Sequence, residues 1–289
     1  MKVLIVGGGG MLGHRLLQTL QDKHRVKTTI RDRRESYERF GLFDDRNTCF
    51  GIDGSAPADL ARVLTEFRPD VVVNAAGIVK QRDVATLDAL DANVMLPHRL
   101  DALCRSASAK LIQISTDCVF SGDRGAYSEG DRPDPQDAYG HMKLLGEISA
   151  APHLTLRASM IGTELVRKLG LLEWYLAQRG SIRGYTKAIF SGLTTQELAR
   201  AIDRIICDHP DLTGLWHVAS APISKFDVLR QLTEQLGRDD IEIRGDDSFT
   251  CDRSLDGRRF AARTGYHAPA WNDMLVELAA QIKAEGRLQ

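Results

Sequence analysis

The start of the chain constrains its fold more than any other feature, because an apolar run passes directly into four consecutive glycines. Val3–Val6 has the continuous apolar character of a strand buried on both faces, and Gly7, Gly10 and Gly13 follow it at intervals of three. Leucines at helical spacing then predict a helix over residues 10–20. One glycine permits the tight turn, another lets backbone approach a pyrophosphate, and the third lets helix and strand pack closely. We expect the dinucleotide to contact Gly7, Gly10, Met11, Leu12 and Gly13.

A glycine-rich turn without a ligand has the same pattern, so the surrounding elements matter. Apolar runs alternate with amphipathic stretches over the first half of the chain. Strands are predicted over residues 3–6, 26–30, 49–52, 71–73, 111–114 and 154–156, and helices over 10–20, 60–67, 87–103 and 139–149. This alternation predicts the α/β class, with a doubly wound parallel sheet of Rossmann type covered by helices on both faces.

The pattern changes after about Arg157. Helices are predicted over residues 165–178, 195–207, 225–236 and 272–283, with only short strands between them. We therefore expect a dinucleotide-binding Rossmann domain over residues 1–160, with residues 191–220 folding back onto it. Residues 161–289 are expected to form a smaller, mostly helical substrate lobe.

Composition excludes several classes of protein. The net charge of −1 over 289 residues argues against general binding to nucleic acid or to anionic membranes. No apolar run approaches the roughly 20 residues needed to cross a bilayer, and no signal peptide precedes the first strand, so a cytoplasmic protein is predicted. The five cysteines have no C-x-x-C pair and the eight histidines no H-x-x-x-H pair. We expect reduced thiols and no metal site.

The end of the second predicted strand bears on the choice of cofactor. Arg31 and Asp32 follow Ile30, close to where this kind of motif places the residue that contacts the ribose. An arginine there favours the 2′-phosphate of NADP, whereas an acid favours NAD. Because Arg31 comes first, NADP is preferred and NAD stays open. An exposed arginine in a charged turn is the alternative interpretation.

Tyr139 and Lys143 are four residues apart in a predicted helix, so they share one helical face. An ammonium beside a tyrosine lowers the phenol's pKa from about 10 by favouring the phenolate. Tyr139 could then protonate a ketone oxygen as hydride arrives. The spacing alone is common, but Thr116 leaves the carboxyl end of a buried strand, where ligands bind in such sheets. A hydroxyl there can orient a substrate carbonyl.

With these residues in place, the chain resembles the extended short-chain dehydrogenase/reductase family over essentially its whole length. Residues 114–122, ISTDCVFSG, are similar to the corresponding stretch of dTDP-4-dehydrorhamnose reductases. Residues 73–77, VNAAG, and Asn93 in the following helix also match the family. The late matches are residues 252–256, Gly265 and Trp271.

The resemblance implies a role for each matching residue. Thr116, Tyr139 and Lys143 would be the catalytic set, with Lys143 also holding the nicotinamide ribose. Asp53 would lie near the adenine. The residues lining the cofactor would be Ala75, Ala76 and Gly77. Those near the sugar would be Thr116, Asp117, Cys118 and Met160, and Arg253 would bind the diphosphate, since a guanidinium suits phosphate.

Two residues depart from the family pattern. Cys118 stands where an aromatic residue usually follows the Thr-Asp pair, and Met160 stands where the family often has tryptophan. Both implied positions face the sugar, so the sugar's identity stays open. We interpret Cys118 as a small residue of the pocket, with a reactive thiol as the alternative.

The predicted function is NADPH-dependent reduction of the 4-keto group of a nucleotide-activated deoxysugar, in the making of surface polysaccharide precursors. The carrier nucleotide, dTDP or UDP, stays open, as does a homodimer. A 4,6-dehydratase is disfavoured because Cys118 replaces the glutamate that such enzymes use for proton transfer. An epimerase stays open, and so does a non-catalytic NADP-binding regulatory subunit, because the fold alone does not fix the function.

Overall fold

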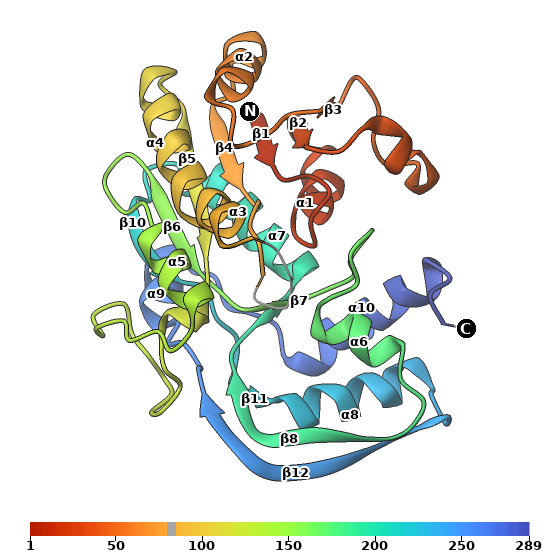
Figure 1. Cartoon of the computed structure of the whole chain (residues 1–289). Helices are drawn as coiled ribbons and strands as arrows, with labels where there is room; N and C mark the ends of the chain where they lie inside the picture. The colour runs from red at the N-terminus through yellow and green to blue at the C-terminus, as the bar shows by residue number, and fades with distance from the viewer. Residues whose placement is uncertain (80–84, 289) are drawn as a thin grey trace. The chain divides into compact units, whose positions relative to one another are not determined.

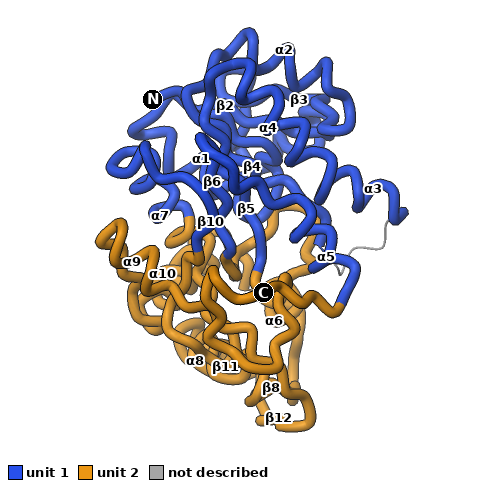
Figure 2. Tube along the Cα trace, turned by 90° about the vertical axis from the view of Figure 1, so that its left-hand side faces the viewer, with its two compact units in different colours: residues 1–116, 137–157, 199–216 blue, residues 117–136, 158–198, 217–289 orange. Residues whose placement is uncertain are grey.

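The computed structural model describes residues 1–79 and 85–288. Its chain divides into two compact units, shown in blue and orange in Figure 2. Unit 1 comprises residues 1–116, 137–157 and 199–216, and unit 2 comprises residues 117–136, 158–198 and 217–289. In the described residues, no helix is both long and apolar enough to cross a membrane.

Unit 1 is built on a seven-stranded sheet with the order β10-β6-β5-β4-β1-β2-β3 (Figure 1). Among strands β1 to β6, all neighbours in the sheet pair in parallel. The chain order reverses between β1 and β4, which is where doubly wound sheets bind their ligands. The prediction of an α/β fold with a doubly wound parallel sheet is confirmed. The strands are β1 Lys2–Val6, β2 Arg25–Ile30, β3 Thr48–Phe50, β4 Val71–Asn74, β5 Lys110–Ser115, β6 Leu154–Arg157 and β10 Gly214–His217.

The central strands are buried on both faces, and this explains their unbroken apolar sequences. Leu4 and Val6 of β1 belong to a core cluster with side chains of helices α2 and α4. Val3 and Ile5 point to the opposite face, as the alternation of a strand requires. The helices of this unit are α1 Gly13–Leu20, α2 Pro57–Phe67, α3 Thr86–Leu90, α4 Leu96–Ser106 and α5 Ala138–Leu145, with a π-helical turn over Asp91–Met95 and 3₁₀ turns over Arg34–Ser36 and Glu38–Phe40.

Unit 2 contains two long strands that the sequence analysis did not predict. Strands β8 Gly180–Phe190 and β12 Ile241–Asp252 pair in parallel, and β11 Ile223–Ser224 joins β8 on its other side. The expectation that only short strands separate the later helices is therefore wrong. Helix α8 packs against β8 and β12, and the burial of β8 alternates, so neither strand has a continuous apolar run. The other elements are β7 Met160–Ile161, α6 Leu171–Leu176, β9 Leu193–Thr194, α7 Thr195–Asp208 (which runs into unit 1), α8 Lys225–Leu236, α9 Arg258–Thr264, α10 Trp271–Ala284 and a 3₁₀ turn over Asp117–Val119.

The helix predicted over residues 165–178 is also shorter than expected, because it begins only at Leu171. The buried carboxylate of Glu164 accepts hydrogen bonds from the backbone N–H groups of Leu169 and Gly170. Lys168 has a φ of 54°, in the left-handed region. The local polar contacts thus hold residues 164–170 as a turn, and the helix starts after them.

Candidate active site

The glycine turn between β1 and α1 is packed backbone against backbone. Gly7 has a φ of 90°, and a Cβ there would lie 2.8 Å from the backbone of Ala76. A Cβ on Gly13 would collide with the carbonyl oxygen of Gly7, whereas one on Gly10 would lie 3.3 Å from the same oxygen. The turn therefore requires glycine at the first and third positions of the motif.

Two side chains that the sequence analysis missed hold this turn in place. His14 is buried, and its Nδ1 lies 2.8 Å from the carbonyl oxygen of Gly10, which accepts its hydrogen. Tyr37 packs against the turn so closely that a Cβ on Gly9 would collide with its hydroxyl. That hydroxyl donates to Asp32 at 3.3 Å. His14 lies in α1, four residues after Gly10, whereas Tyr37 is brought to the turn from the segment that follows β2.

Most of the predicted cofactor residues lie at or near the glycine turn, whereas Arg31 and Asp53 lie in exposed segments after β2 and before α2. Ala76 is packed against Gly7, and Gly77 lies beside Lys143, because a Cβ on Gly77 would be 4.0 Å from the Lys143 ammonium. The backbone N–H of Ala75 donates to the carbonyl oxygen of Val6. These residues are thus brought together at the carboxyl ends of β1 and β4. Met11 is half-buried and Leu12 is buried.

Arg31 and Asp53 are both exposed. Arg31 directly follows β2, as predicted from the sequence. The carboxylate of Asp53 accepts a hydrogen bond from the backbone N–H of Ser55 in the turn before α2. A further residue, Asn93, is buried in the π-helical turn and makes two hydrogen bonds with the backbone of Ile78, which fixes the segment that follows β4.

Helix α5 carries the predicted proton donor and lysine. Asp137 caps the helix by accepting a hydrogen bond from the backbone N–H of Gly140 at 2.8 Å. Tyr139 is half-buried on the first turn, and the buried Lys143 lies one turn later on the same face. The ammonium of Lys143 donates to the carbonyl oxygen of Ile114 at 2.7 Å. This contact places Lys143 at the carboxyl end of β5, two residues before Thr116.

Burial lowers the pKa of Lys143 to about 8, and the charge of Glu147 opposes this shift. Glu147 is held in turn by two buried partners. Arg157 donates to both of its carboxylate oxygens, at 2.7 and 2.8 Å, and the hydroxyl of Ser115 donates at 2.7 Å. The lysine therefore lies beside a fixed carboxylate, which favours its charged form at neutral pH.

The predicted substrate residues of unit 2 lie in three places: the turn after Thr116, strand β7, and the segment that follows β12. Cys118 is half-buried, and its sulfur accepts a hydrogen bond from the Arg253 guanidinium at 3.4 Å. Asp117 is buried in the same 3₁₀ turn as Cys118. Met160 is half-buried in the short strand β7, which pairs with β9. Cys118 and Arg253, which are far apart in sequence, are thus brought together.

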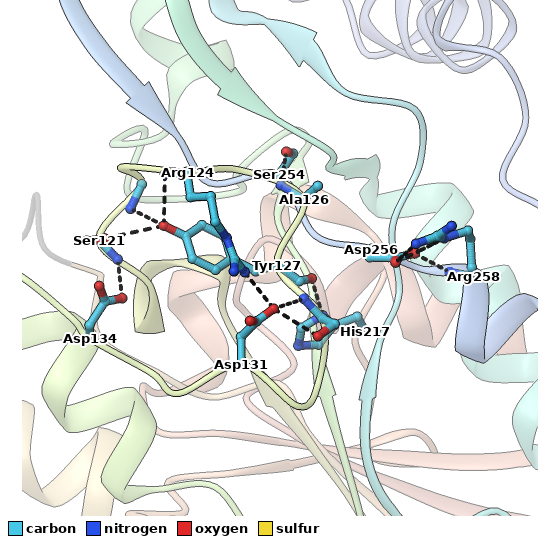
Figure 3. A network of polar contacts seen from close by, with 12 residues as sticks. Ser121, Arg124, Ala126, Tyr127, Asp131, Asp134, His217, Ser254, Asp256 and Arg258 are labelled. Carbon is cyan, nitrogen blue, oxygen red and sulfur yellow. Dashed lines mark hydrogen bonds and ion pairs between the residues drawn. The ribbon is translucent and has the colours of Figure 1, made fainter.

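A polar network fixes the loop that follows Cys118 (Figure 3). The hydroxyl of Tyr127 accepts hydrogen bonds from the backbone N–H groups of Gly122 and Arg124, and its ring stacks on Phe120 at 4.2 Å. The backbone of Tyr127 is also bonded to Ser254 and Asp256. The loop is therefore tied to the segment that carries Arg253.

The chain is similar to known proteins in both sequence and fold. The family model described as the RmlD substrate binding domain matches residues 1–283. A dTDP-4-dehydrorhamnose reductase of Burkholderia thailandensis is 32% identical over 155 residues, covering 52% of this chain and 46% of that protein. The methionine adenosyltransferase 2 subunit beta of Bos taurus is 34% identical over 148 residues, covering 50% of this chain and 41% of that protein. The alignments thus span less than half the length of either relative.

The fold has a solved counterpart. The crystal structure of a dTDP-4-dehydrorhamnose reductase from Bacillus anthracis in complex with NADP matches with a TM-score of 0.78. The match covers 97% of this chain and 99% of that one, at 21% sequence identity. This level of identity shows a shared fold.

Proposed function

The chain belongs to the RmlD substrate binding domain family, and we propose that it reduces the 4-keto group of a nucleotide-activated deoxysugar with NADPH. One observation carries the proposal. The buried Lys143 joins helix α5, which bears Tyr139, to the carboxyl end of β5, directly before Thr116. Gly77, at the end of β4, lies beside the same ammonium. This placement supports roles for Tyr139 as the proton donor, for Lys143 as its partner and for Thr116 as the hydroxyl that orients the carbonyl.

The residues present fit NADP. The close packing at Gly7 and Gly13 fixes the path of the glycine turn before α1, where backbone N–H groups would meet a pyrophosphate. Arg31 is exposed at the end of β2, where a guanidinium would pair with a 2′-phosphate. Lys143 has three N–H donors, and Ile114 accepts from one of them, so the ribose hydroxyls are suitable partners for the others. The cofactor would supply the hydride.

The protein's own groups would handle the proton and the carbonyl. Tyr139 would donate its phenolic proton to the ketone oxygen, and the Lys143 ammonium would stabilise the phenolate left behind. Thr116 would hold the carbonyl by a hydrogen bond and orient it. In unit 2, Arg253 would bind the diphosphate, and Asp117, Cys118 and Met160 would contact the sugar. A cytoplasmic location and a role in polysaccharide precursor synthesis are part of the same proposal.

A second candidate is a non-catalytic subunit on the same fold. The similarity to a protein named as a subunit of methionine adenosyltransferase favours keeping this candidate. The Thr116, Tyr139 and Lys143 set weighs against it, since a subunit without a reaction has no need of a buried lysine beside a helical tyrosine. An epimerase would use a similar set of residues, so only the experiment below distinguishes it from a reductase.

The test is a panel of dTDP- and UDP-linked 4-keto-6-deoxy sugars, incubated with NADPH and followed by absorbance and by identification of the product. We expect stoichiometric oxidation of NADPH with at least one sugar, and no oxidation in the Tyr139→Phe variant. Deuterium exchange into the sugar ring without NADPH oxidation would indicate an epimerase. No reaction with any sugar would favour the subunit.

A further inference from the structure

A cluster of metal-ligating side chains lies in unit 1, away from the glycine turn. His24 precedes β2, whereas Asp203 and Cys207 are four residues apart on α7. Among the residues that the structure describes, this is the one group of at least three potential ligand atoms that lie within 4.8 Å of one another. We propose that His24, Asp203 and Cys207 form a binding site for Zn²⁺ or a chemically similar transition-metal ion.

The distances between the donor atoms match a tetrahedral zinc site. Bond lengths of about 2.3 Å for Zn–S and about 2.0 Å for Zn–N and Zn–O place S and N (or O) about 3.5 Å apart and N and O about 3.3 Å apart. The Cys207 sulfur lies 3.6 Å from both the His24 Nε2 and the Asp203 Oδ1. The His24 Nε2 lies 2.8 Å from the Asp203 Oδ1, so this pair would separate slightly around an ion.

The surroundings suit a metal ion as well. The side chains of His24 and Asp203 are only 4% and 9% exposed, whereas Cys207 is exposed and leaves a path for entry. Lys23 bonds to Oδ2 of Asp203, so Oδ1 remains directed at His24 and Cys207. Lys23 would then orient the carboxylate from its other oxygen, as outer partners of metal ligands commonly do.

The chemistry of the donors selects the ion. One sulfur, one imidazole nitrogen and one carboxylate oxygen suit Zn²⁺, whereas Mg²⁺ and Ca²⁺ prefer oxygen ligands. A bound dication favours the thiolate form of Cys207, and the thiol proton leaves to solvent as the metal–sulfur bond forms.

The site lies at the opposite end of the sheet from the glycine turn. His24 comes directly before the first residue of β2, whereas the turn follows the last residue of β1, and these two strands run in parallel. An ion here would tie α7 to the loop between α1 and β2. Its effect would be on stability, since none of its ligands belongs to the proposed catalytic set.

The test uses the full chain without an affinity tag, reduced and freed of metal, titrated with Co²⁺ and then with Zn²⁺. We expect one Co²⁺ per chain with a thiolate-to-cobalt charge-transfer band in the near-ultraviolet, displaced by Zn²⁺, and a melting temperature that rises with Zn²⁺. Cys207→Ser should abolish the band, and His24→Ala should weaken Co²⁺ binding at least about tenfold. The control Cys251→Ser, in unit 2, should keep the band.

Two results would overturn the proposal. One is the absence of a charge-transfer band in the wild-type protein at Co²⁺ concentrations up to millimolar. The other is a band that survives in Cys207→Ser, because the thiolate ligand would then be another cysteine. Circular dichroism confirms the folding of each variant, and Cys207 is a safe position for substitution because its side chain is exposed.

Discussion

The two units hold their candidate site residues in different ways. In unit 1, the positions are set against the backbone. Gly7 packs against Ala76 and Gly13 against Gly7, and the Lys143 ammonium donates a hydrogen bond to the carbonyl of Ile114. In unit 2, Cys118 and Arg253 contact each other through their side chains, and hydrogen bonds of the loop around Tyr127 hold their segments together. The first arrangement tolerates little change, whereas the second can accept other side chains on the same framework.

This difference indicates that unit 1 should determine the rate of the proposed reaction, whereas unit 2 should determine which sugar is bound. The proposed hydride and proton transfer depends on groups fixed to a rigid sheet, and rigid placement is what such steps require. The proposed sugar contacts depend on side chains that meet other side chains, and such contacts can be remade by other residues on the same framework. Substitutions in the two units should therefore affect different kinetic constants.

The largest effect is expected for Tyr139→Phe in unit 1. Loss of a general acid should reduce kcat by about 10²- to 10⁴-fold. Binding of NADPH, measured by fluorescence titration, should stay within about threefold of the wild-type value, because the phenyl ring keeps the packing of α5. Turnover near the wild-type rate would show that Tyr139 is not the proton donor.

Arg253→Met tests the corresponding contact in unit 2. Losing a charged hydrogen bond worth about 1.5–3 kcal/mol should raise KM for the nucleotide sugar by roughly 10- to 100-fold. KM for NADPH should not change. Arg258→Met is the matched control, because Arg258 is exposed and pairs with Asp256 at the surface. An equal effect of both substitutions would remove Arg253 from the proposed site.

Gly13→Ala tests whether backbone packing sets the turn of unit 1. The added Cβ collides with the carbonyl oxygen of Gly7, and overpacking of this kind costs about 1–3 kcal/mol. Gly10→Ala should lower the free energy of unfolding less, because its Cβ would lie 3.3 Å from the same oxygen, a contact that a small shift of the backbone relieves. Urea denaturation of both variants measures the difference. Equal stabilities would contradict the packing argument.

The pH dependence of kcat/KM tests the buried lysine. The pKa of Lys143 is about 8, so the ammonium loses its proton as the pH rises through that value, and kcat/KM should fall on the alkaline side. Glu147 raises this pKa, so Glu147→Gln should move the alkaline limb to lower pH. Circular dichroism should confirm that the variant is folded. If its alkaline limb does not move, Glu147 does not raise the pKa of Lys143.

The smallest effect is expected for Arg31→Ala. Arg31 is exposed, so its proposed pairing with a 2′-phosphate should be worth about 1 kcal/mol, or roughly fivefold in KM for NADPH. KM for NADH should stay unchanged, because NADH has no phosphate there. If KM rises equally for NADPH and NADH, Arg31 does not determine a preference for NADP.

Strands β1 to β6 of the parallel sheet in unit 1 could be predicted from local sequence patterns, whereas β10 was not predicted. Strands buried on both faces need unbroken apolar runs, as in Val3–Val6 and Val71–Val73, and such runs are visible without a structure. The glycine spacing and the Tyr139–Lys143 pair are equally local, because each depends on residues within one turn or one helix. These features were therefore predictable.

Contacts between residues far apart in the chain appear only in the folded structure. Strands β8 and β12 carry no continuous apolar run, since α8 covers one face of their pair, and their pairing shows only once the chain has folded. Tyr37 supports the glycine turn from a segment that follows β2. His24 and Cys207 lie 183 residues apart, so the spacing of histidines and cysteines could not reveal them as neighbours. Folding sets such contacts through the packing of whole elements, which no local pattern records.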